Sequence, residues 1–333
     1  MSEVGETICA RFHSLGDVVL TTGILREVAR LEGRAVSILT EARFAPIFDG
    51  LPFIDRLWTR EAPPRDQQFR RVIDLQGSGA SARILDPLGP RRVLRGRGLA
   101  RRWTVVWGDR RPRLSVPHVL ARYAEAAGLP REEATMQCRP EVAVTPSEAA
   151  RASEQYPGLL TPPRSPRVAL LTGASRRSKA YPTERFLEVG RRLEEAGCEV
   201  LWFEAPGQAT RTPWMTVRAE LGSLKALLAT ASLAVSNDSG PMHLASALGV
   251  PVVAIFGSSV RRLGFAPTGP RDQLIEAEDV ACRPCGVHGR DQCWLGHWRC
   301  LRDVAAERVV KAALSALLNL GFAVRASEVG DDA

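Results

Sequence analysis

The chain has 333 residues, of which 45% are hydrophobic and 25% are charged. This composition is typical of a globular protein and excludes a disordered tail protein, and the length suits two domains of roughly 150 residues each. The formal net charge is +8, and a positive surface attracts phosphates, nucleic acid and anionic lipid alike.

The apolar runs of the sequence are short. Residues 250–256 form one of the longest, far below the roughly 20 residues that a membrane-spanning helix needs. The start of the chain, MSEVGETICARF, carries Glu3 and Glu6 where a secretory signal would carry basic residues. The sequence therefore predicts a cytoplasmic protein.

The basic residues are nearly all arginines. Of the 45 lysines and arginines, only Lys179, Lys225 and Lys311 are lysines. Residues 91–113 hold nine arginines against the single acid Asp109. Such a stretch is either a solvated loop with an edge strand or a surface that meets anionic lipid or an anionic substrate.

The seven cysteines divide into three scattered ones and a cluster. Cys9, Cys138 and Cys198 lie in or beside apolar stretches and are expected to be small core residues. The cluster has the spacing C-x2-C-x7-C-x6-C and consists of Cys282, Cys285, Cys293 and Cys300. In a reducing compartment it is a candidate structural metal site, for instance for zinc, with reduced thiols in a packed loop or disulfides as alternatives. We expect this segment to be structural and distant from any chemistry.

The first half of the chain alternates between strand and helix patterns. Strands are predicted at residues 7–12, 35–39, 54–58 and 72–75, and helices at 18–31, 117–127 and 146–155. This alternation is typical of a parallel sheet covered on both faces.

The proline-rich stretch 157–166 has the composition of an interdomain linker. After it, strands are predicted at 168–171, 199–203, 233–236 and 251–256, and helices at 183–196, 223–230, 241–248 and 304–320. The sequence thus predicts an α/β protein with two doubly wound domains, residues 1–156 and 167–325, separated by the linker 157–166. The second domain includes the cysteine-rich segment 282–300.

Three loops follow predicted strands and precede helices. They contain residues 13–17, residues 172–179 and residues 237–243. Parallel sheets bind ligands at the carboxyl ends of their strands, where helix N-termini present free N–H groups to anions. The first loop lacks the G-x-G-x-x-G pattern, which argues against a nicotinamide dehydrogenase.

The third loop, residues 237–243, is the most informative of the three. Asp238, Ser239 and Gly240 precede a helix whose first turn holds Pro241, where a missing N–H costs nothing. His243 lies one turn into that helix. The loop is therefore a candidate anion cradle, with a helix cap at Asp238 and a core position for His243 as the structural alternative.

Several motifs together resemble a known family. They are RFHSLGDVVLTTGILREV, VIDLQGSGASARIL, LLTGASRRSKAYPTERF, SNDSGPMHLASALGVPVVAIFG and the cysteine segment ending GHWRCLRDV. The chain resembles the bacterial ADP-heptose:lipopolysaccharide heptosyltransferases, glycosyltransferase family 9, over nearly its whole length. The cysteine segment is most similar to the heptosyltransferase II branch, which adds the second heptose.

The resemblance implies the GT-B fold, in which two Rossmann-like domains face each other across a cleft. It implies an N-terminal acceptor-binding domain and a C-terminal donor-binding domain. It also implies an inverting transfer of heptose or a related sugar from an ADP-sugar to a lipopolysaccharide core or another lipid-linked saccharide.

The resemblance also assigns roles to single residues. Asp17 would be the general base, and Lys179 would neutralise the donor diphosphate. The implied donor-binding residues are Thr172, Gly173, Ser175, Asp238, Ser239, Gly240 and His243, and Ser14 and Gly16 would lie on the acceptor side. The chain departs from the usual family residues at His13, Gly23 and Tyr181, of which His13 and Tyr181 are expected at the cleft.

No cofactor is expected, since Lys179 and helix N-termini can carry the diphosphate and no acidic D-x-D pair stands where a metal-dependent transferase needs one. The expected partners are the ADP-sugar, the lipid-linked acceptor and an anionic membrane surface touched peripherally from the cytoplasm. A GT-B transferase for another nucleotide sugar and another surface glycan is one alternative. An arginine-rich nucleic-acid-binding protein is the other, and the absence of a recognition-helix motif disfavours it.

Overall fold

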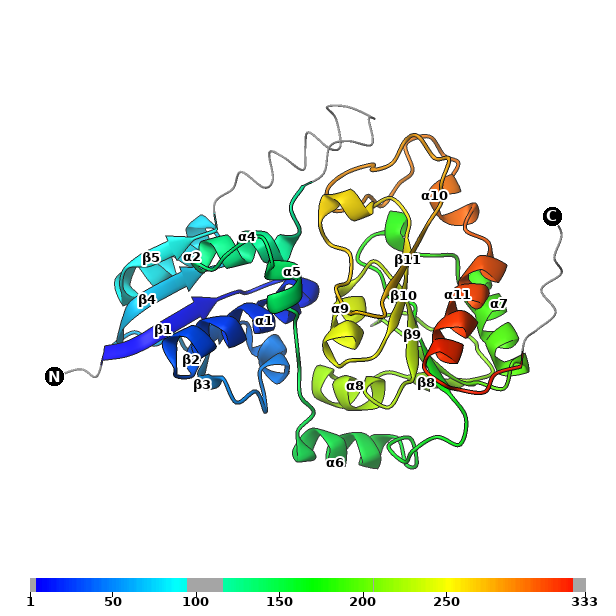
Figure 1. Ribbon diagram of the computed structural model, residues 1–333, viewed down its shortest axis with the longest axis horizontal. Helices are drawn as coiled ribbons and strands as arrows, with labels where there is room; N and C mark the ends of the chain where they lie inside the picture. The colour runs from blue at the N-terminus through cyan, green and yellow to red at the C-terminus, as the bar shows by residue number, and fades with distance from the viewer. Residues whose placement is uncertain (1–3, 95–115, 206, 326–333) are drawn as a thin grey trace.

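The computed structural model describes residues 4–94, 116–205 and 207–325 (Figure 1). Within these ranges each half of the chain builds a parallel β-sheet. The first sheet has the order β3-β2-β1-β4-β5 and the second has the order β11-β10-β9-β6-β7-β8. The α/β fold with two doubly wound sheets, expected from the alternation of strand and helix patterns, is confirmed.

The first half supplies five of the described strands and most of the helices around them. Its strands are β1 (Val4–Ala10), β2 (Val36–Thr40), β3 (Ile54–Thr59), β4 (Gln68–Asp74) and β5 (Arg91–Val93). Its helices are α1 (Leu15–Glu32), α2 (Gly79–Leu85), α4 (Val119–Ala126) and α5 (Ala134–Gln137), with short 3₁₀ turns η1 (Ala42–Ile47) and η2 (Asp86–Leu88).

The second half supplies six described strands. They are β6 (Arg167–Leu171), β7 (Glu199–Phe203), β8 (Met215–Val217), β9 (Leu233–Asn237), β10 (Val252–Phe256) and β11 (Gln273–Glu276). Its helices are α7 (Thr183–Glu195), α8 (Leu221–Leu228), α9 (Gly240–Ala247), α10 (Arg299–Arg302) and α11 (Ala306–Asn319), with 3₁₀ turns η4 (Arg177–Lys179) and η5 (Arg261–Leu263). Helix α6 (Pro146–Gln155) ends the predicted first domain but packs against α8 of the second.

Both sheets reverse their direction of winding at one point. In the first sheet the chain starts at β1, adds β2 and β3 on one side, and then returns to place β4 on the other side. In the second sheet the same happens between β6 and β9. Such switch points open a crevice at the carboxyl ends of the strands. The loops after β1, β6 and β9 therefore lie where a ligand is expected.

Side chains of the second sheet point alternately to its two faces, so each face has its own layer of hydrophobic core. Ala169, Leu171 and Phe203 face the side of α8 and α9, whereas Leu170 and Trp202 face the side of α7 and α11. Figure 1 shows α7 and α11 on the outer side and α8 and α9 towards the first domain. Because the inner layer joins the core of the first domain, the two halves share one continuous cluster.

The two halves meet closely at α1 and α9. A Cβ on Gly240 of α9 would lie 2.8 Å from the Cβ of Leu15 in α1. Helix α6 makes a second bridge: its buried Glu148 pairs with the buried Lys225 of α8, whose ammonium also donates to the carbonyl of Pro46 in the first domain. The catalytic candidates on the two sides are thus held by direct packing of the domains.

The structure places three residues that depart from the family pattern. Gly23 of α1 packs against the backbone of residues 138–139, and a Cβ there would lie 2.1 Å from the carbonyl oxygen of Cys138. Tyr181, expected at the cleft, is instead buried in the second core, where its hydroxyl donates to the Val304 carbonyl. That expectation was wrong, because the ring packs edge-on against Phe186 of α7. His13 is exposed at the start of the first loop.

The basic stretch 91–113 is described only in part, since residues 95–113 lie outside the described ranges. Arg91 opens β5 and forms ion pairs with Asp74 and Asp86, so its charge is neutralised within the fold. Cys9, Cys138 and Cys198 are buried, as expected. Among the described residues, no helix is both long enough and apolar enough to cross a membrane.

Candidate active site

The loop after β1 delivers Asp17 to the carboxyl end of the first sheet. Helix α1 begins at Leu15, and Asp17 lies in its first turn, where the helix dipole favours a negative charge. One carboxylate oxygen of Asp17 accepts a hydrogen bond from the Tyr123 hydroxyl at 2.6 Å. The other pairs with Arg11 at 2.7 Å and accepts from the Ser14 hydroxyl at 3.1 Å. Asp17 is therefore a fixed carboxylate.

The environment of Asp17 keeps it ionised. Burial acts to raise its pKa, but the Arg11 guanidinium and the hydrogen bonds from Tyr123 and Ser14 hold the pKa of this carboxyl below its usual value. Its side chain is still 20% exposed. A carboxylate has about four lone-pair positions, so it can accept a further hydrogen bond from a bound hydroxyl. Sequence reasoning missed Arg11 and Tyr123, which lie at the end of β1 and in α4.

Tyr123→Phe is expected to slow sugar transfer roughly tenfold, equivalent to about 1.4 kcal/mol of transition-state stabilisation. The substitution removes only the hydroxyl that fixes one Asp17 oxygen. Steady-state kinetics should show a lower kcat with little change in KM for the donor. Unchanged kcat in a folded Tyr123→Phe variant would show that Asp17 does not need this contact.

Lys179 lies at the end of the short turn η4, in the loop after β6. Its ammonium group pairs with Asp238 at 2.7 Å, and both side chains are nearly buried. Asp238 follows β9, so the pair spans the switch point of the second sheet. Because an ammonium has three N–H donors, Asp238 fixes the lysine and leaves donors that can meet a phosphate.

The other predicted residues of the β6 loop lie near the end of β7. The Thr172 hydroxyl donates to the carbonyl of Phe203, and the Asn237 amide donates to the carbonyl of Thr172. A Cβ on Gly173 would lie 3.0 Å from the Cβ of Ala205. Ser175 is exposed further along the loop. Thr172 and Gly173 therefore lie at the carboxyl ends of β6, β7 and β9.

The third loop ends at the N-terminus of α9, as predicted. Ser239 is the N-cap residue, and Pro241 lies in the first turn, whose N–H groups have no partner inside the helix. His243 is 5% exposed. A Cβ on Gly16 of the first domain would lie 2.7 Å from its Cδ2 atom. The imidazole ring therefore lies where the loop after β1 packs against the segment after β9.

His243 is electrostatically coupled to both predicted catalytic groups. Burial is the main cause that lowers the pKa of His243 to about 4, with Asp238 and Asp17 acting in the opposite direction and Lys179 in the same one. The imidazole is therefore neutral at pH 7. Its neighbourhood joins Asp17 of the first domain with the Lys179–Asp238 pair of the second.

The lowered pKa of His243 predicts a pH effect on stability. Between pH 6.5 and about 4 the unfolded chain binds more protons at this residue than the folded chain. Stability should therefore fall as the pH drops through this window, by roughly 3 kcal/mol at most. Urea unfolding of the parent and of His243→Gln at pH 7 and pH 5 tests this. The variant should lose less stability than the parent, and equal losses would contradict the assignment.

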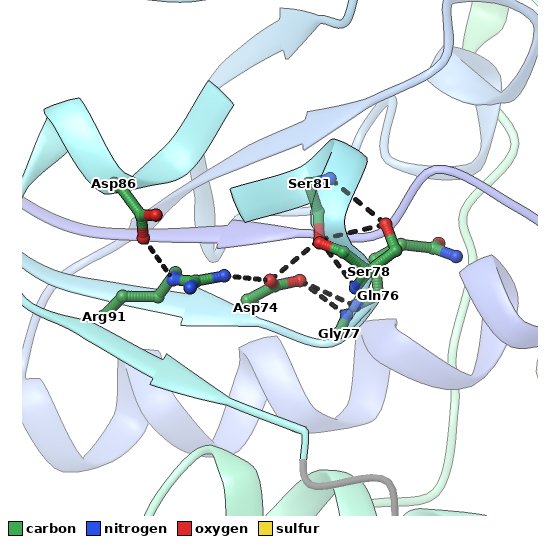
Figure 2. A network of polar contacts seen from close by, with 7 residues as sticks. All are labelled: Asp74, Gln76, Gly77, Ser78, Ser81, Asp86 and Arg91. Carbon is green, nitrogen blue, oxygen red and sulfur yellow. Dashed lines mark hydrogen bonds and ion pairs between the residues drawn. The ribbon is translucent and has the colours of Figure 1, made fainter. Parts of the chain in front are cut away.

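A further polar network, which the sequence analysis did not assign, orders the loop after β4 (Figure 2). The buried Asp74 carboxylate accepts hydrogen bonds from the backbone N–H groups of Gln76 and Gly77, from the Ser81 hydroxyl and from Arg91. The Gln76 amide lies 3.2 Å from Nε2 of His13. Arg91 and Asp74 therefore fix a loop beside the one that carries Asp17.

The cysteine segment does not lie where it was expected. All four clustered cysteines are free thiols. The Cys285 thiol donates to the carbonyl of Cys282 at 3.6 Å, and Cys282 Sγ lies 3.8 Å from Nε2 of His297. In the described part of the chain, no group of three or more His, Cys, Asp or Glu side chains is arranged to hold a metal ion. The loop between Cys285 and Cys293 packs against Lys179. The expectation that the segment is distant from the chemistry was wrong.

Two parallel sheets, each with ligand-facing loops at its switch point, define a two-domain α/β architecture. Residues 64–295 match glycosyltransferase family 9 (heptosyltransferase). The chain therefore belongs to glycosyltransferase family 9, and the expected family is confirmed.

Individual relatives agree with this assignment. Lipooligosaccharide heptosyltransferase 2 of Campylobacter jejuni is 36% identical over 95 residues, a match that spans only 28% of this chain and 28% of that protein. Lipopolysaccharide heptosyltransferase 1 of Pseudomonas aeruginosa is 26% identical over 321 residues, covering 84% and 85% of the two chains. The structure of E. coli ADP-heptose lipopolysaccharide heptosyltransferase II aligns with a TM-score of 0.69 at 17% identity, covering 95% of this chain and 99% of that one. This likeness confirms the GT-B fold.

Proposed function

We propose that the protein is an inverting heptosyltransferase that moves heptose from an ADP-sugar to a lipopolysaccharide core acceptor. The observation that carries this proposal is the packing of His243 of α9 against Gly16, which brings the loop of Asp17 up to the helix that directly follows the Lys179–Asp238 pair. Family membership and the names of the relatives support the sugar and the acceptor class.

In this proposal Asp17 takes the proton of the acceptor hydroxyl. As the hydroxyl oxygen attacks the anomeric carbon, the bond from that carbon to the diphosphate breaks and the proton passes to the carboxylate. Arg11 and Tyr123 keep the carboxylate ionised and oriented. Because a single displacement occurs, the anomeric configuration inverts and no covalent enzyme intermediate forms.

The leaving diphosphate gathers negative charge, which the second domain can stabilise. Lys179 supplies a full positive charge, and the first N–H groups of α9 supply aligned dipoles. Asp238 keeps Lys179 in place before the donor binds. These residues could perform this step without a divalent ion.

The proposal includes peripheral contact of the protein with an anionic membrane that carries the lipid-linked acceptor. The net charge of +8 supports this contact, since each basic residue near such a surface adds on the order of 1 kcal/mol and the attraction is screened by salt. We expect binding to anionic vesicles that weakens as salt rises, measured by co-sedimentation. Equal binding to neutral and anionic vesicles would contradict it.

A structural metal at Cys282, Cys285, Cys293 and Cys300 stays a prediction. The four side chains do not come together in a group that could hold a metal ion. Metal analysis of the purified protein tests it, together with folding and activity of Cys293→Ser. Bound zinc that the variant loses would support the prediction. Metal-free, folded protein with four freely titratable thiols would exclude it.

The proposed donor is tested by thermal shift against nucleoside diphosphates and nucleotide sugars. ADP and ADP-heptose should raise the unfolding temperature of the parent more than the uridine or thymidine compounds do. Selectivity for UDP or TDP would keep the fold and overturn the proposed donor. A shift with duplex DNA and none with any nucleotide sugar would overturn the proposed activity.

A further inference from the structure

The turn that carries Lys179 packs against the cysteine segment. Arg176 pairs with Asp291, and the Arg177 guanidinium lies 5.9 Å from the ring centre of Trp298. Ser178, which directly precedes the lysine, is 3% exposed. Three successive residues of one loop are therefore in contact with a segment more than 100 positions further along the chain.

Ser178 is the centre of this contact. Its backbone N–H donates to the carbonyl of Arg290 at 2.9 Å, and its hydroxyl accepts from the backbone N–H of Arg290 at 2.7 Å. The same hydroxyl lies 2.7 Å from the hydroxyl of Ser258, whose N–H donates to the carbonyl of Ser178 at 2.9 Å. The N–H of Cys285 reaches the Ser258 carbonyl at 3.3 Å. Ser178 thus joins the turn to two separate loops.

Gly289 lets the cysteine segment approach this closely. Its φ is +77°, and a Cβ there would lie 2.9 Å from the Ser178 hydroxyl oxygen and 3.2 and 3.3 Å from Cγ and Cε of Lys179. The backbone of Gly289 therefore forms a wall along the lysine side chain. A methyl group at this position would push the lysine or the Ser178 hydroxyl away.

We propose that the loop between Cys285 and Cys293 is a positioning element for Lys179, with Ser178 and Gly289 as its positioning residues. The wall at Gly289 and the hydrogen bonds of Ser178 confine the lysine side chain and aim its ammonium at Asp238 and at a bound diphosphate. This inference rests on the proposed function, because its effect on binding passes through Lys179.

The chain offers matched controls for Gly289→Ala within the same segment. Gly296 also has a positive φ, +71°, but a Cβ there would meet nothing within 4 Å, so Gly296→Ala measures backbone strain alone. Gly286 has no positive φ and its nearest neighbours would lie 3.9 Å away, so Gly286→Ala measures added bulk alone. The readouts are ADP affinity by calorimetry, KM for each substrate and the unfolding temperature.

Gly289→Ala should bind ADP at least about tenfold more weakly than the parent, whereas both control variants should stay within about threefold. KM should rise for the donor and stay unchanged for the acceptor. In the double variant Lys179→Ala/Gly289→Ala, ADP affinity should equal that of Lys179→Ala, because the two residues act through one group. Should Gly289→Ala fail to fold, Ser258→Ala removes one hydroxyl of the same network and should weaken ADP binding in the same direction.

ADP affinity of Gly289→Ala equal to that of Gly296→Ala would overturn the inference. So would additive losses in the double variant, or parent-like binding by Ser258→Ala where Gly289→Ala does not fold. In these cases a loss of ADP binding in Lys179→Ala alone would leave the proposed function standing. Parent-like ADP binding by Lys179→Ala would overturn the proposed role of the lysine and the inference together.

Discussion

Asp17→Asn is expected to reduce the transfer rate by roughly 10²- to 10⁴-fold, the contribution of general base catalysis, while ADP affinity stays near that of the parent. The amide keeps the shape of the carboxylate but cannot take the acceptor proton at neutral pH. Single-turnover kinetics with saturating donor measure the chemical step, and calorimetry measures ADP binding.

Asp55→Asn is a suitable control for this experiment, since Asp55 is an exposed aspartate of β3 outside the site. It should transfer sugar like the parent. If Asp17→Asn also transfers sugar at the parent rate, another residue is the base. If Asp17→Asn loses both ADP binding and its fold, the Asp17 carboxylate has a structural role, which its contacts with Arg11 and Tyr123 would explain.

Lys179→Ala should weaken ADP binding and turnover together, because the charge acts on a group that is present in both the ground state and the transition state. A hydrogen bond to a charged group contributes about 1.5–3 kcal/mol, which corresponds to a loss in affinity of roughly ten- to a hundredfold. The variant also leaves Asp238, only 7% exposed, without its cation. That adds repulsion towards the diphosphate.

Lys179→Arg tests what kind of cation the site needs. In a chain with only three lysines, a lysine at this position suggests a compact point charge rather than a planar fork. The wall at Gly289 and the pair with Asp238 give the physical reason, since little room remains for a guanidinium. Lys311→Ala, on the exposed face of α11, is the control. Full activity of Lys179→Arg would contradict the argument for lysine.

The central elements of the fold could be predicted from the sequence because their strands are buried on both faces. The strand β10 is continuously apolar, and β6 and β9 are apolar apart from Arg167 at the start of β6 and Ser236 and Asn237 at the end of β9, which predicts parallel strands covered by helices. The short strands β8 and β11 were not predicted, and β5 was covered only by the interpretation of residues 91–113 as a solvated loop with an edge strand. Each lies at or near a sheet edge and has partly exposed residues, so the hydrophobic pattern there is weak.

The candidate site was predictable where it depends on local sequence. Loops after β1, β6 and β9 carry the motif residues, and the topology brings these loops to the switch points whatever the intervening sequence. Arg11 stands in the same local motif as Asp17, but no role was assigned to it from the sequence. Tyr123 was not predictable in this way, because it reaches Asp17 from a helix 106 positions away and no spacing rule links the two.

The position of the cysteine segment could not be predicted from local sequence either. Its position after the nucleotide loops in the sequence predicted that it would lie apart from the chemistry. In the fold, residues 289 and 290 instead lie against Ser178 and Lys179. The contact depends on a long-range return of the chain over the carboxyl end of the sheet, which the local pattern of residues does not encode.

In the proposed mechanism Asp17 deprotonates the acceptor in a single displacement of ADP, which the second domain holds. The anomeric configuration of the product, determined by NMR on sugar transferred from a donor of known configuration, is the decisive measurement for this mechanism. We expect inversion in the product made by the parent. Retention of configuration would require two displacements or a different mechanism, and it would contradict the role assigned to Asp17.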